Sequence, residues 1–293
     1  MTLKEIKEAY LRIISQAIEE DIGAGDVTSL SVLPDCKIKA KVVAREKMVL
    51  CGVQSAVLTY SLLSPKVKVQ ILSRDGEVVV KGQEILKVSG PARVILSGER
   101  IVLNFLSRLS GVATLTSEFV QIGGEYTKII DTRKTLPGWR VLEKYAVRCG
   151  GGMNHRMGLY DQILIKDNHI AIISKKLGVS KEQAVIEAVR QAKSFVKEKK
   201  LRMKIEVEIE DFASLRGAIK EKPHIIMLDN MNYKNLSRAI EEIRKTAPEI
   251  KIEISGRMTK QKIKRIAQLR PDYISVGAIT HSAPAVDIGM ELE

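Results

Sequence analysis

The chain has 293 residues, of which 45% are hydrophobic and 4% aromatic, and its formal net charge is +13. This composition is typical of a globular protein of one or two domains and excludes a largely disordered chain. No apolar run approaches the roughly 20 residues needed to cross a bilayer, so we expect no membrane partner and a cytoplasmic location.

The three cysteines, Cys36, Cys51 and Cys149, are far apart in the sequence. Their spacing supports neither a disulfide framework nor a structural zinc site. The excess of cations is compatible with nucleic acid, an anionic surface or small polyanionic substrates. Since no basic run is interleaved with aromatic residues, we expect no nucleic-acid partner.

The N-terminal part predicts a helix followed by a small sheet. Residues 3–20 place apolar side chains at helical spacing. Residues 35–90 contain alternating segments that predict strands, interrupted by a helix near 52–63, and Asp75-Gly76 is typical of a hairpin turn. The segment from Gly90 to Gly124 predicts one long helix broken at Gly111, or two helices in tandem.

The remainder alternates short apolar runs with amphipathic helical segments. The runs are TKIIDT, QILIKDN, KIEVEIED, IIMLDN, KIEISGR and YISVGAI, and the helical segments cover 180–199, 211–221, 233–246 and 259–268. This alternation predicts parallel strands with helical crossovers. Since the strands end in polar residues, and since functional groups of β/α barrels lie at the C-terminal ends of strands, we expect a site there.

Five cationic or titratable side chains lie at predicted strand ends or beside glycine turns: Arg133, Lys134, His155, Arg156 and Lys166. Arginine matches carboxylate and phosphate groups with a planar fork, so these residues predict an anion pocket. Three further cations, Arg140, Lys144 and Arg148, are interpreted as the solvated face of a helix.

Glu206 and Glu208 share one face of a predicted strand, and Asp229 ends the next strand. These carboxylates predict Mg²⁺ binding or contacts to sugar hydroxyls, with exposure of Glu206 at a barrel rim as the alternative. The small residues in EISGR and SVGAIT follow strands, where backbone N–H groups bind phosphate. A substrate with phosphate and carboxylate groups is expected.

The segment DTRKTLPGWRVLEKYAVRCGGGMNHRMGLYDQILIKDNHI resembles the quinolinate phosphoribosyltransferases, as do EDIGAGDVTS, SGERIVLNFLSRLSGVAT, IMLDN, EISGR and ISVGAITHSAPAVDIGM. The resemblance covers nearly the whole chain. It implies an N-terminal open-faced α/β sandwich domain, residues 1–112 with 282–293 returning to it, and a C-terminal incomplete (β/α) barrel, residues 113–281.

The activity that the resemblance implies converts quinolinate and phosphoribosyl pyrophosphate to nicotinate mononucleotide, pyrophosphate and CO₂ in de novo NAD biosynthesis. It implies Mg²⁺ as the cofactor and a homodimer, or a higher oligomer, in which Arg100 of one subunit completes the pocket of its partner.

The residue roles are carried over by motif. Arg133, Lys134, His155 and Arg156 would hold the two quinolinate carboxylates, and Lys166 would serve the pyrophosphate. Glu208 and Asp229, supported by Glu206, would hold ribose hydroxyls and Mg²⁺, which makes Lys134, Lys166, Glu208 and Asp229 the expected catalytic group. The remaining expected substrate-binding residues are those of the phosphate turns and one strand end: Thr132, Ser255, Gly256, Arg257, Val276, Gly277 and Ala278.

Three alternatives stay open. A molybdenum-transport-associated homologue has the same fold, but the carboxylate-binding cations favour the transferase. A nicotinate phosphoribosyltransferase handles one ring carboxylate and needs fewer cations. A basic nucleic-acid-binding protein would show salt-dependent DNA binding without turnover, and the clustering of charges at strand ends disfavours it.

Overall fold

The computed structural model describes residues 2–293, which divide into two compact units. The first unit contains the residues up to Glu118 together with 134–152 and 278–293, and the second contains 119–133 and 153–277. The expected domain division at residues 112 and 113 stays a proposal. The structural division differs from it chiefly by placing 134–152 in the first unit.

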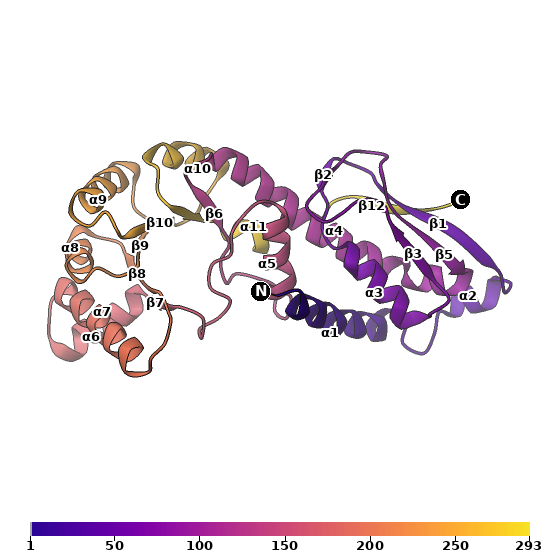
Figure 1. Ribbon diagram of the computed structural model, residues 1–293, viewed down its shortest axis with the longest axis horizontal. Coiled ribbons are helices and arrows are strands. Elements are labelled where there is room, and N and C mark those ends of the chain that lie inside the picture. The colour runs from indigo at the N-terminus through magenta and orange to yellow at the C-terminus, as the bar shows by residue number, and fades with distance from the viewer. Residues whose placement is uncertain (1) are drawn as a thin grey trace. The chain divides into compact units, whose positions relative to one another are not determined.

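The first unit holds most helices of the N-terminal half and two antiparallel sheets (Figure 1). Its elements are α1 (Leu3–Asp21), α2 (Val27–Val32), β1 (Lys37–Ala44), β2 (Met48–Val49), α3 (Val53–Leu63), β3 (Lys68–Ile71), β4 (Val78–Val79), β5 (Glu84–Pro91), α4 (Ala92–Gly123), α5 (Arg140–Cys149), α11 (Ala278–His281) and β12 (Ile288–Leu292). Helix α4 continues past Glu118 into the second unit.

The larger sheet of the first unit has the strand order β12-β1-β5-β3. The C-terminal strand β12 pairs with β1, with Ala40 opposite Leu292, so the last residues join the N-terminal sheet. Buried side chains of α3 and α4, among them Tyr60 and Leu106, pack with Val42 and Leu86 of the sheet. Strand β3, at one edge of this sheet, is largely exposed.

Local signals account for the helix boundaries in this unit. Helix α1 begins in a capping box, in which Glu5 N–H donates to the Thr2 hydroxyl at 3.2 Å and Thr2 N–H donates to the Glu5 carboxylate at 2.6 Å. Helix α4 continues unbroken through Gly111, where the backbone of Pro284 leaves no space for a Cβ. The predicted interruption at Gly111 is therefore wrong.

Two further predictions for the first unit need correction. Asp75-Gly76 does form a turn, with Gly76 at φ +91°, but β3 pairs with β5 and β4 with β2, so the turn does not close a hairpin. Instead, Asp75 Oδ1 accepts hydrogen bonds from Gly52 N–H and Val53 N–H at the start of α3. Lys144 is completely buried, so α5 presents no continuous solvated face of cations.

The second unit is an open parallel barrel wall of six strands in the order β6-β11-β10-β9-β8-β7. Its elements are β6 (Lys128–Ile130), β7 (Ile163–Ile165), α6 (Asp167–Leu177), α7 (Lys181–Glu198), β8 (Ile205–Ile209), α8 (Phe212–Glu221), β9 (Ile225–Asp229), α9 (Tyr233–Thr246), β10 (Lys251–Ser255), α10 (Lys260–Ile266), the 3-10 turn η1 (Ala267–Leu269) and β11 (Tyr273–Ser275). All six predicted strands are present and parallel.

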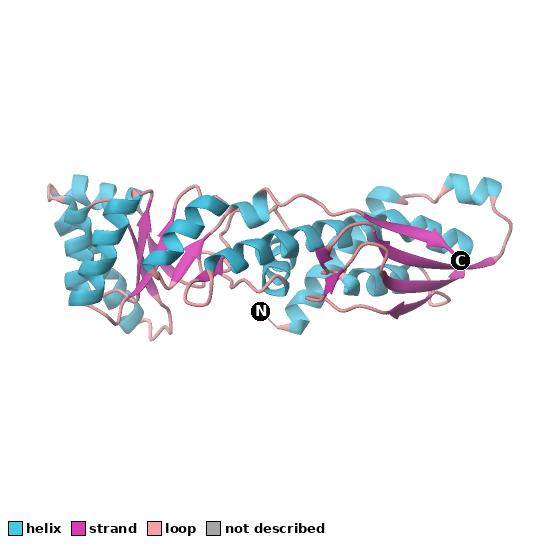
Figure 2. Cartoon of the chain, turned by 90° about the horizontal axis from the view of Figure 1, so that it is seen from above, coloured by secondary structure: helices cyan, strands magenta, loops and turns pink. Residues whose placement is uncertain are grey.

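The helices of the second unit lie on the outer side of the strands, as Figures 1 and 2 show for α6 to α9. Strands β6 and β7 are the two edges of the sheet, so the barrel is incomplete, as the family resemblance implies. Along residues 2–293, none of the helices combines the length and the apolar character that crossing a bilayer would require.

Candidate active site

A short loop brings His155 and Arg156 to the interior of the second unit, and Asp131 fixes its path. Asp131 follows β6 and is completely buried. Its Oδ1 accepts a hydrogen bond from His155 N–H at 2.9 Å, and its Oδ2 accepts one from the Asn154 side chain at 2.7 Å. A buried carboxylate requires hydrogen-bond donors, and this loop conformation supplies them. Asp131 therefore stabilises the backbone position of His155.

The glycine run before this loop is shaped by packing in the first unit. Gly151 has φ +83°, which strains any residue with a Cβ. Gly150 and Gly152 lie so close to Ala113 and Thr116 of α4 that neither position has space for a Cβ. The three glycines therefore allow close packing against α4 in addition to a tight backbone path.

Arg156 is the most deeply buried cation among the predicted site residues of the second unit, with 7% of its surface exposed. Its Nη1 donates to the Gln162 carbonyl at 3.0 Å. Burial lowers the pKa of the Arg156 guanidinium from its ordinary value, and the nearby charge of Arg133 acts in the same direction. Two cations that repel each other in a partly dehydrated place favour an anionic ligand.

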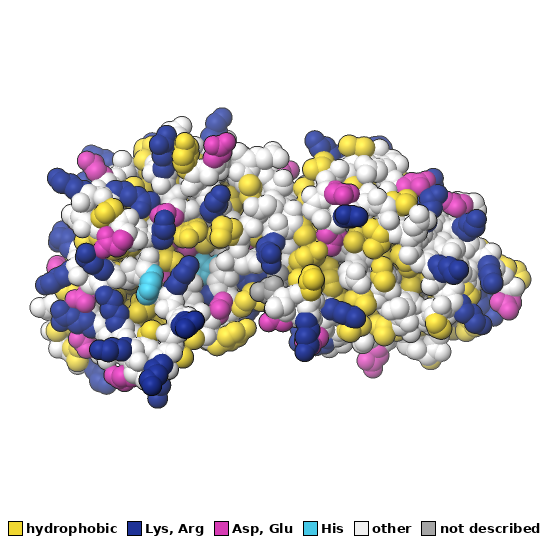
Figure 3. Space-filling model, viewed as in Figure 1, with side chains coloured by type: hydrophobic (Ala, Val, Ile, Leu, Met, Phe, Trp, Pro, Cys, Tyr) yellow, Lys and Arg dark blue, Asp and Glu magenta, His cyan; other side chains and the backbone are white. Residues whose placement is uncertain are grey.

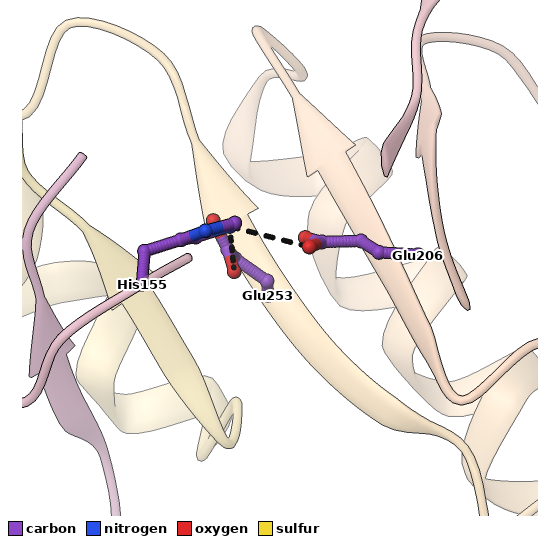
Figure 4. Close-up of side chains that lie close together, drawn as sticks. All are labelled: His155, Glu206 and Glu253. Carbon is purple, nitrogen blue, oxygen red and sulfur yellow. Dashed lines mark ion pairs between the residues drawn. The ribbon is translucent and has the colours of Figure 1, made fainter. Parts of the chain in front are cut away.

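His155 lies against two buried glutamates from different strands (Figure 4). Its Nε2 is 3.2 Å from Glu206 Oε2 on β8 and 3.6 Å from Glu253 Oε2 on β10. Glu206 also accepts a hydrogen bond from the Gln162 side chain at 2.5 Å. Since Glu206 has no exposed surface, the alternative that it is exposed at a barrel rim is wrong.

Lys166 and Glu208 form an ion pair at the next strand ends. Lys166 follows β7, and its Nζ lies 2.9 Å from Glu208 Oε2 on β8. Burial raises the pKa of Glu208, while the hydrogen bond from Lys166 opposes that shift. The Lys166 side chain is 45% exposed, so its ammonium group is accessible to a ligand. Asp229 ends β9 and accepts a hydrogen bond from the Asn230 side chain at 2.6 Å.

The turn after β10 matches the predicted phosphate-binding turn in position and backbone geometry. Gly256 has φ +106°, and Asn230 leaves no space there for a Cβ. Asn230 N–H donates to the Ser255 carbonyl at 3.2 Å, which joins the turns after β9 and β10. Arg257, the next residue, is exposed. At the end of β11, buried Val276 donates its N–H to the Ile130 carbonyl at 2.9 Å and leads into Gly277.

The other predicted site residues are distributed between the two units. Arg133 is exposed in the second unit, where half-buried Thr132 precedes it. Arg100, Lys134 and Ala278 belong to the first unit. Arg100 is exposed on α4, and the Lys134 carbonyl accepts a hydrogen bond from the Thr280 hydroxyl at 2.7 Å.

Among the described residues, one group of side chains has the donor types and proximity for a metal ion: His155, Glu206 and Glu253, whose ligand atoms lie within 4.8 Å of one another. The predicted metal ligands Glu208 and Asp229 are outside this group. Elsewhere, the face in Figure 3 shows cations scattered with acids among them.

Sequence reasoning did not assign a role to Asp131, Gln162 or Glu253. For Glu253 a signal existed, because a glutamate alternates with Ile252 and Ile254 inside a buried parallel strand, where side chains are ordinarily apolar. The partner of Glu253 lies on β8, two strands away in the sheet, so the sequence order does not reveal the pair.

Comparisons with known proteins agree along nearly the whole chain. Residues 26–110 match the family model of the quinolinate phosphoribosyl transferase N-terminal domain, and residues 112–291 match that of the C-terminal domain. The chain is 41% identical to a probable carboxylating nicotinate-nucleotide pyrophosphorylase of Bacillus subtilis over 96% of this chain and 92% of the relative. A probable carboxylating nicotinate-nucleotide pyrophosphorylase of Methanocaldococcus jannaschii is 39% identical over 98% of each chain.

A solved structure gives the same result. The nicotinate-nucleotide pyrophosphorylase from Francisella tularensis superposes with a TM-score of 0.88 and 36% sequence identity, covering 98% of this chain and 96% of that one.

Proposed function

Because the chain belongs to the quinolinate phosphoribosyltransferase family, we propose that it joins quinolinate to the ribose of phosphoribosyl pyrophosphate and releases pyrophosphate and CO₂. The product is nicotinate mononucleotide, a precursor in de novo NAD biosynthesis. The observation that carries the proposal is the buried Arg156, on which the charge of Arg133 acts, in the same unit as the Lys166–Glu208 pair, in a family member matched over both domains.

The cations account for recognition of the aromatic substrate. Quinolinate carries two adjacent carboxylates on a flat ring, so it requires cations with planar hydrogen-bonding geometry. Arg133 and Arg156 supply this geometry, and Lys134 and His155 are assigned to the same group by motif. Burial of Arg156 strengthens the attraction, since fewer water molecules compete with the carboxylate.

The carboxylates account for the transfer step. As the bond between the anomeric carbon and pyrophosphate breaks, positive charge develops on the ribose, and we assign its stabilisation to the carboxylates of Glu208 and Asp229. The pyridine nitrogen attacks this carbon. Lys166 stabilises the negative charge of the departing pyrophosphate, and it can do so because its ammonium group is partly exposed while its partner Glu208 holds it in place.

Loss of CO₂ then follows from the chemistry of the quaternised ring. The electrons of the broken carbon–carbon bond remain on the carbon beside the positive ring nitrogen, and that carbon takes a proton from water. The protein contributes positioning and electrostatics to this step and needs no dedicated acid or base.

We include Mg²⁺ in the proposal. Glu208 and Asp229 offer two carboxylates at neighbouring strand ends, and Mg²⁺ is commonly held by one or two carboxylates together with substrate phosphates. When bound, Mg²⁺ neutralises charge on the pyrophosphate. The phosphate turns at Ser255-Gly256 and Gly277-Ala278 are proposed to hold the 5′-phosphate through backbone N–H groups.

A homodimer and a cytoplasmic location complete the proposal. The exposed position of Arg100 on α4 supports a role in which this side chain reaches the pocket of a partner subunit.

The proposal is tested with purified protein, Mg²⁺, phosphoribosyl pyrophosphate and quinolinate labelled in the 2-carboxylate. Labelled CO₂, pyrophosphate and nicotinate mononucleotide are expected in equal amounts. Nicotinate in place of quinolinate serves as the control, because it has one carboxylate. Product from nicotinate but not from quinolinate, or no product over a range of pH and temperature, would contradict the proposal.

A further inference from the structure

Glu206 and Glu253 present an electrostatic problem in the interior of the second unit. Their side chains have no exposed surface and 1% exposed surface, respectively. Two ionised carboxylates in such a place repel each other and lose their hydration. The His155 side chain is 9% exposed and directs its Nε2 atom toward both carboxylates (Figure 4).

The hydrogen bonds of His155 define its protonation. Its Nδ1 accepts a hydrogen bond from Arg156 N–H at 2.7 Å, so this nitrogen carries no proton. The proton of the ring is therefore on Nε2, which points at Glu206 Oε2. A neutral imidazole donates one hydrogen bond but does not balance two negative charges.

One carboxylate oxygen of Glu206, one of Glu253 and one ring nitrogen of His155 lie within 4.8 Å of one another, and a proton on one of the two buried carboxyl groups would relieve their repulsion at this distance. Glu206 Oε2 accepts a hydrogen bond from the Gln162 side chain, and the positive charge of Arg156 attracts Glu206. The Ser275 hydroxyl hydrogen-bonds to Glu253, and the negative charges of Glu206 and Asp229 act on it. Burial, followed by the charge of Glu206, raises the pKa of Glu253 well above its ordinary range.

One oxygen of each glutamate, Oε1, is buried without a hydrogen-bond partner when both groups are taken as acceptors. Orphaned buried oxygens are rare and costly. A proton on Glu253 gives this group a donor and relieves the repulsion at the same time.

We propose that Glu253 is a positioning residue, which stands as a neutral carboxylic acid hydrogen-bonded to the Glu206 carboxylate, so that the pair holds His155 and the adjoining Arg156 backbone in place for anion binding. A second ionised carboxylate here would also repel the dianionic substrate. The effect on quinolinate binding rests on the proposed function, whereas the protonation of Glu253 does not.

The first test is infrared spectroscopy of the free protein at about pH 8, where ordinary carboxyl groups are ionised. The wild type should show the carbonyl band of a protonated carboxylic acid, and Glu253→Gln should lack it. The control Glu84→Gln, at a half-buried position on β5, should keep the band. Absence of the band in the wild type, or its persistence in Glu253→Gln, overturns the proposal whatever the protein catalyses.

The second test compares kinetic constants. Gln reproduces a neutral acid in shape and polarity, so Glu253→Gln should keep the KM for quinolinate within about twofold of wild type. Glu206→Gln removes the anionic partner of His155 and should raise that KM by about tenfold or more, as is typical of groups that orient a binding residue.

An equal rise in the KM for quinolinate in both variants would overturn the proposal. So would a KM that is unchanged in Glu206→Gln but raised in Glu253→Gln, because the negative charge would then be on Glu253. The same holds if His155, Glu206 and Glu253 bind a divalent ion. In that case dialysis against a chelator should release a stoichiometric metal from wild type but not from Glu253→Gln. We expect no such metal.

Discussion

Arg156 is a buried cation whose surroundings favour an anionic ligand. Its guanidinium donates to the neutral Gln162 carbonyl and is repelled by Arg133, while the charges of Glu206 and Asp161 attract it. A guanidinium in this environment is costly unless an anion completes it. The residue therefore serves binding more than folding.

Replacement of Arg156 by Ala should raise the KM for quinolinate by roughly 30- to 1,000-fold, which corresponds to about 2–4 kcal/mol for a buried charged contact. The melting temperature should change little, because the guanidinium is repelled by Arg133 in the free protein. Steady-state kinetics and calorimetry measure the two quantities. Arg202→Ala, at an exposed position before β8, is the matched control. A large fall in melting temperature with an unchanged KM would give Arg156 a structural role instead.

Some residues of the site could be predicted from the sequence and others could not. Arg156 and Lys166 stand at recognisable strand ends or turns, and the structure places Lys166 against Glu208 from the next strand. Glu253 forms its pair with a residue 47 positions earlier in the chain, so its role depends on strand order. Amphipathic spacing predicts that Lys144 lies in solvent, whereas tertiary packing buries it.

At the level of elements, the alternation of strands and helices was predictable because each parallel strand is a short apolar run with a polar end. Helix α6 was missed because it begins directly after Lys166, and its first turn, Asp167–His169, was interpreted as the polar end of β7. The capping interaction that starts it, from Lys166 N–H to His169 Nδ1 at 2.9 Å, involves residue types with weak capping preferences.

Asp272, just before β11, connects three elements of the barrel wall. It accepts hydrogen bonds from Arg244 at the end of α9 at 2.7 Å, and from Lys251 at 2.8 Å and Ile252 N–H at 2.9 Å on β10. Burial alone would raise the pKa of Asp272, but the hydrogen bonds from Lys251, Arg244 and Ile252 outweigh it and lower the pKa.

Replacement of Asp272 by Asn should therefore lower the free energy of unfolding by about 2 kcal/mol at neutral pH. A carboxyl with a depressed folded-state pKa contributes its stability above the unfolded-state value of about 3.9 and loses it as the pH falls toward the folded-state value. The difference between variant and wild type should thus shrink below about pH 4. Denaturant unfolding across pH measures this, with exposed Asp287→Asn as the control. A difference that is independent of pH would show that the charge of Asp272 is not the stabilising feature.

At the scale of the whole molecule, the chain returns to its starting sheet through β12, and the proposed site residues belong to both units. The second unit provides the strand ends, while Arg100, Lys134 and Ala278 come from segments of the first. Periodicity predicts the parallel strands with helical crossovers, whereas the two-domain fold and the supply of Arg100 by a partner subunit are implied by the family resemblance, and the latter depends on an interface between chains.

The origin of Arg100 can be decided with hybrid dimers made from Arg100→Ala and Lys166→Ala chains that carry different affinity tags. If Arg100 acts across the interface, the hybrid has one site with both changes and one site with neither. It should then retain about half of the wild-type activity, because a two-fold dimer contains two equivalent sites. The two parental homodimers should each be severely impaired. If Arg100 instead serves its own subunit, both sites of the hybrid carry one change, and the purified hybrid should be as inactive as its parents.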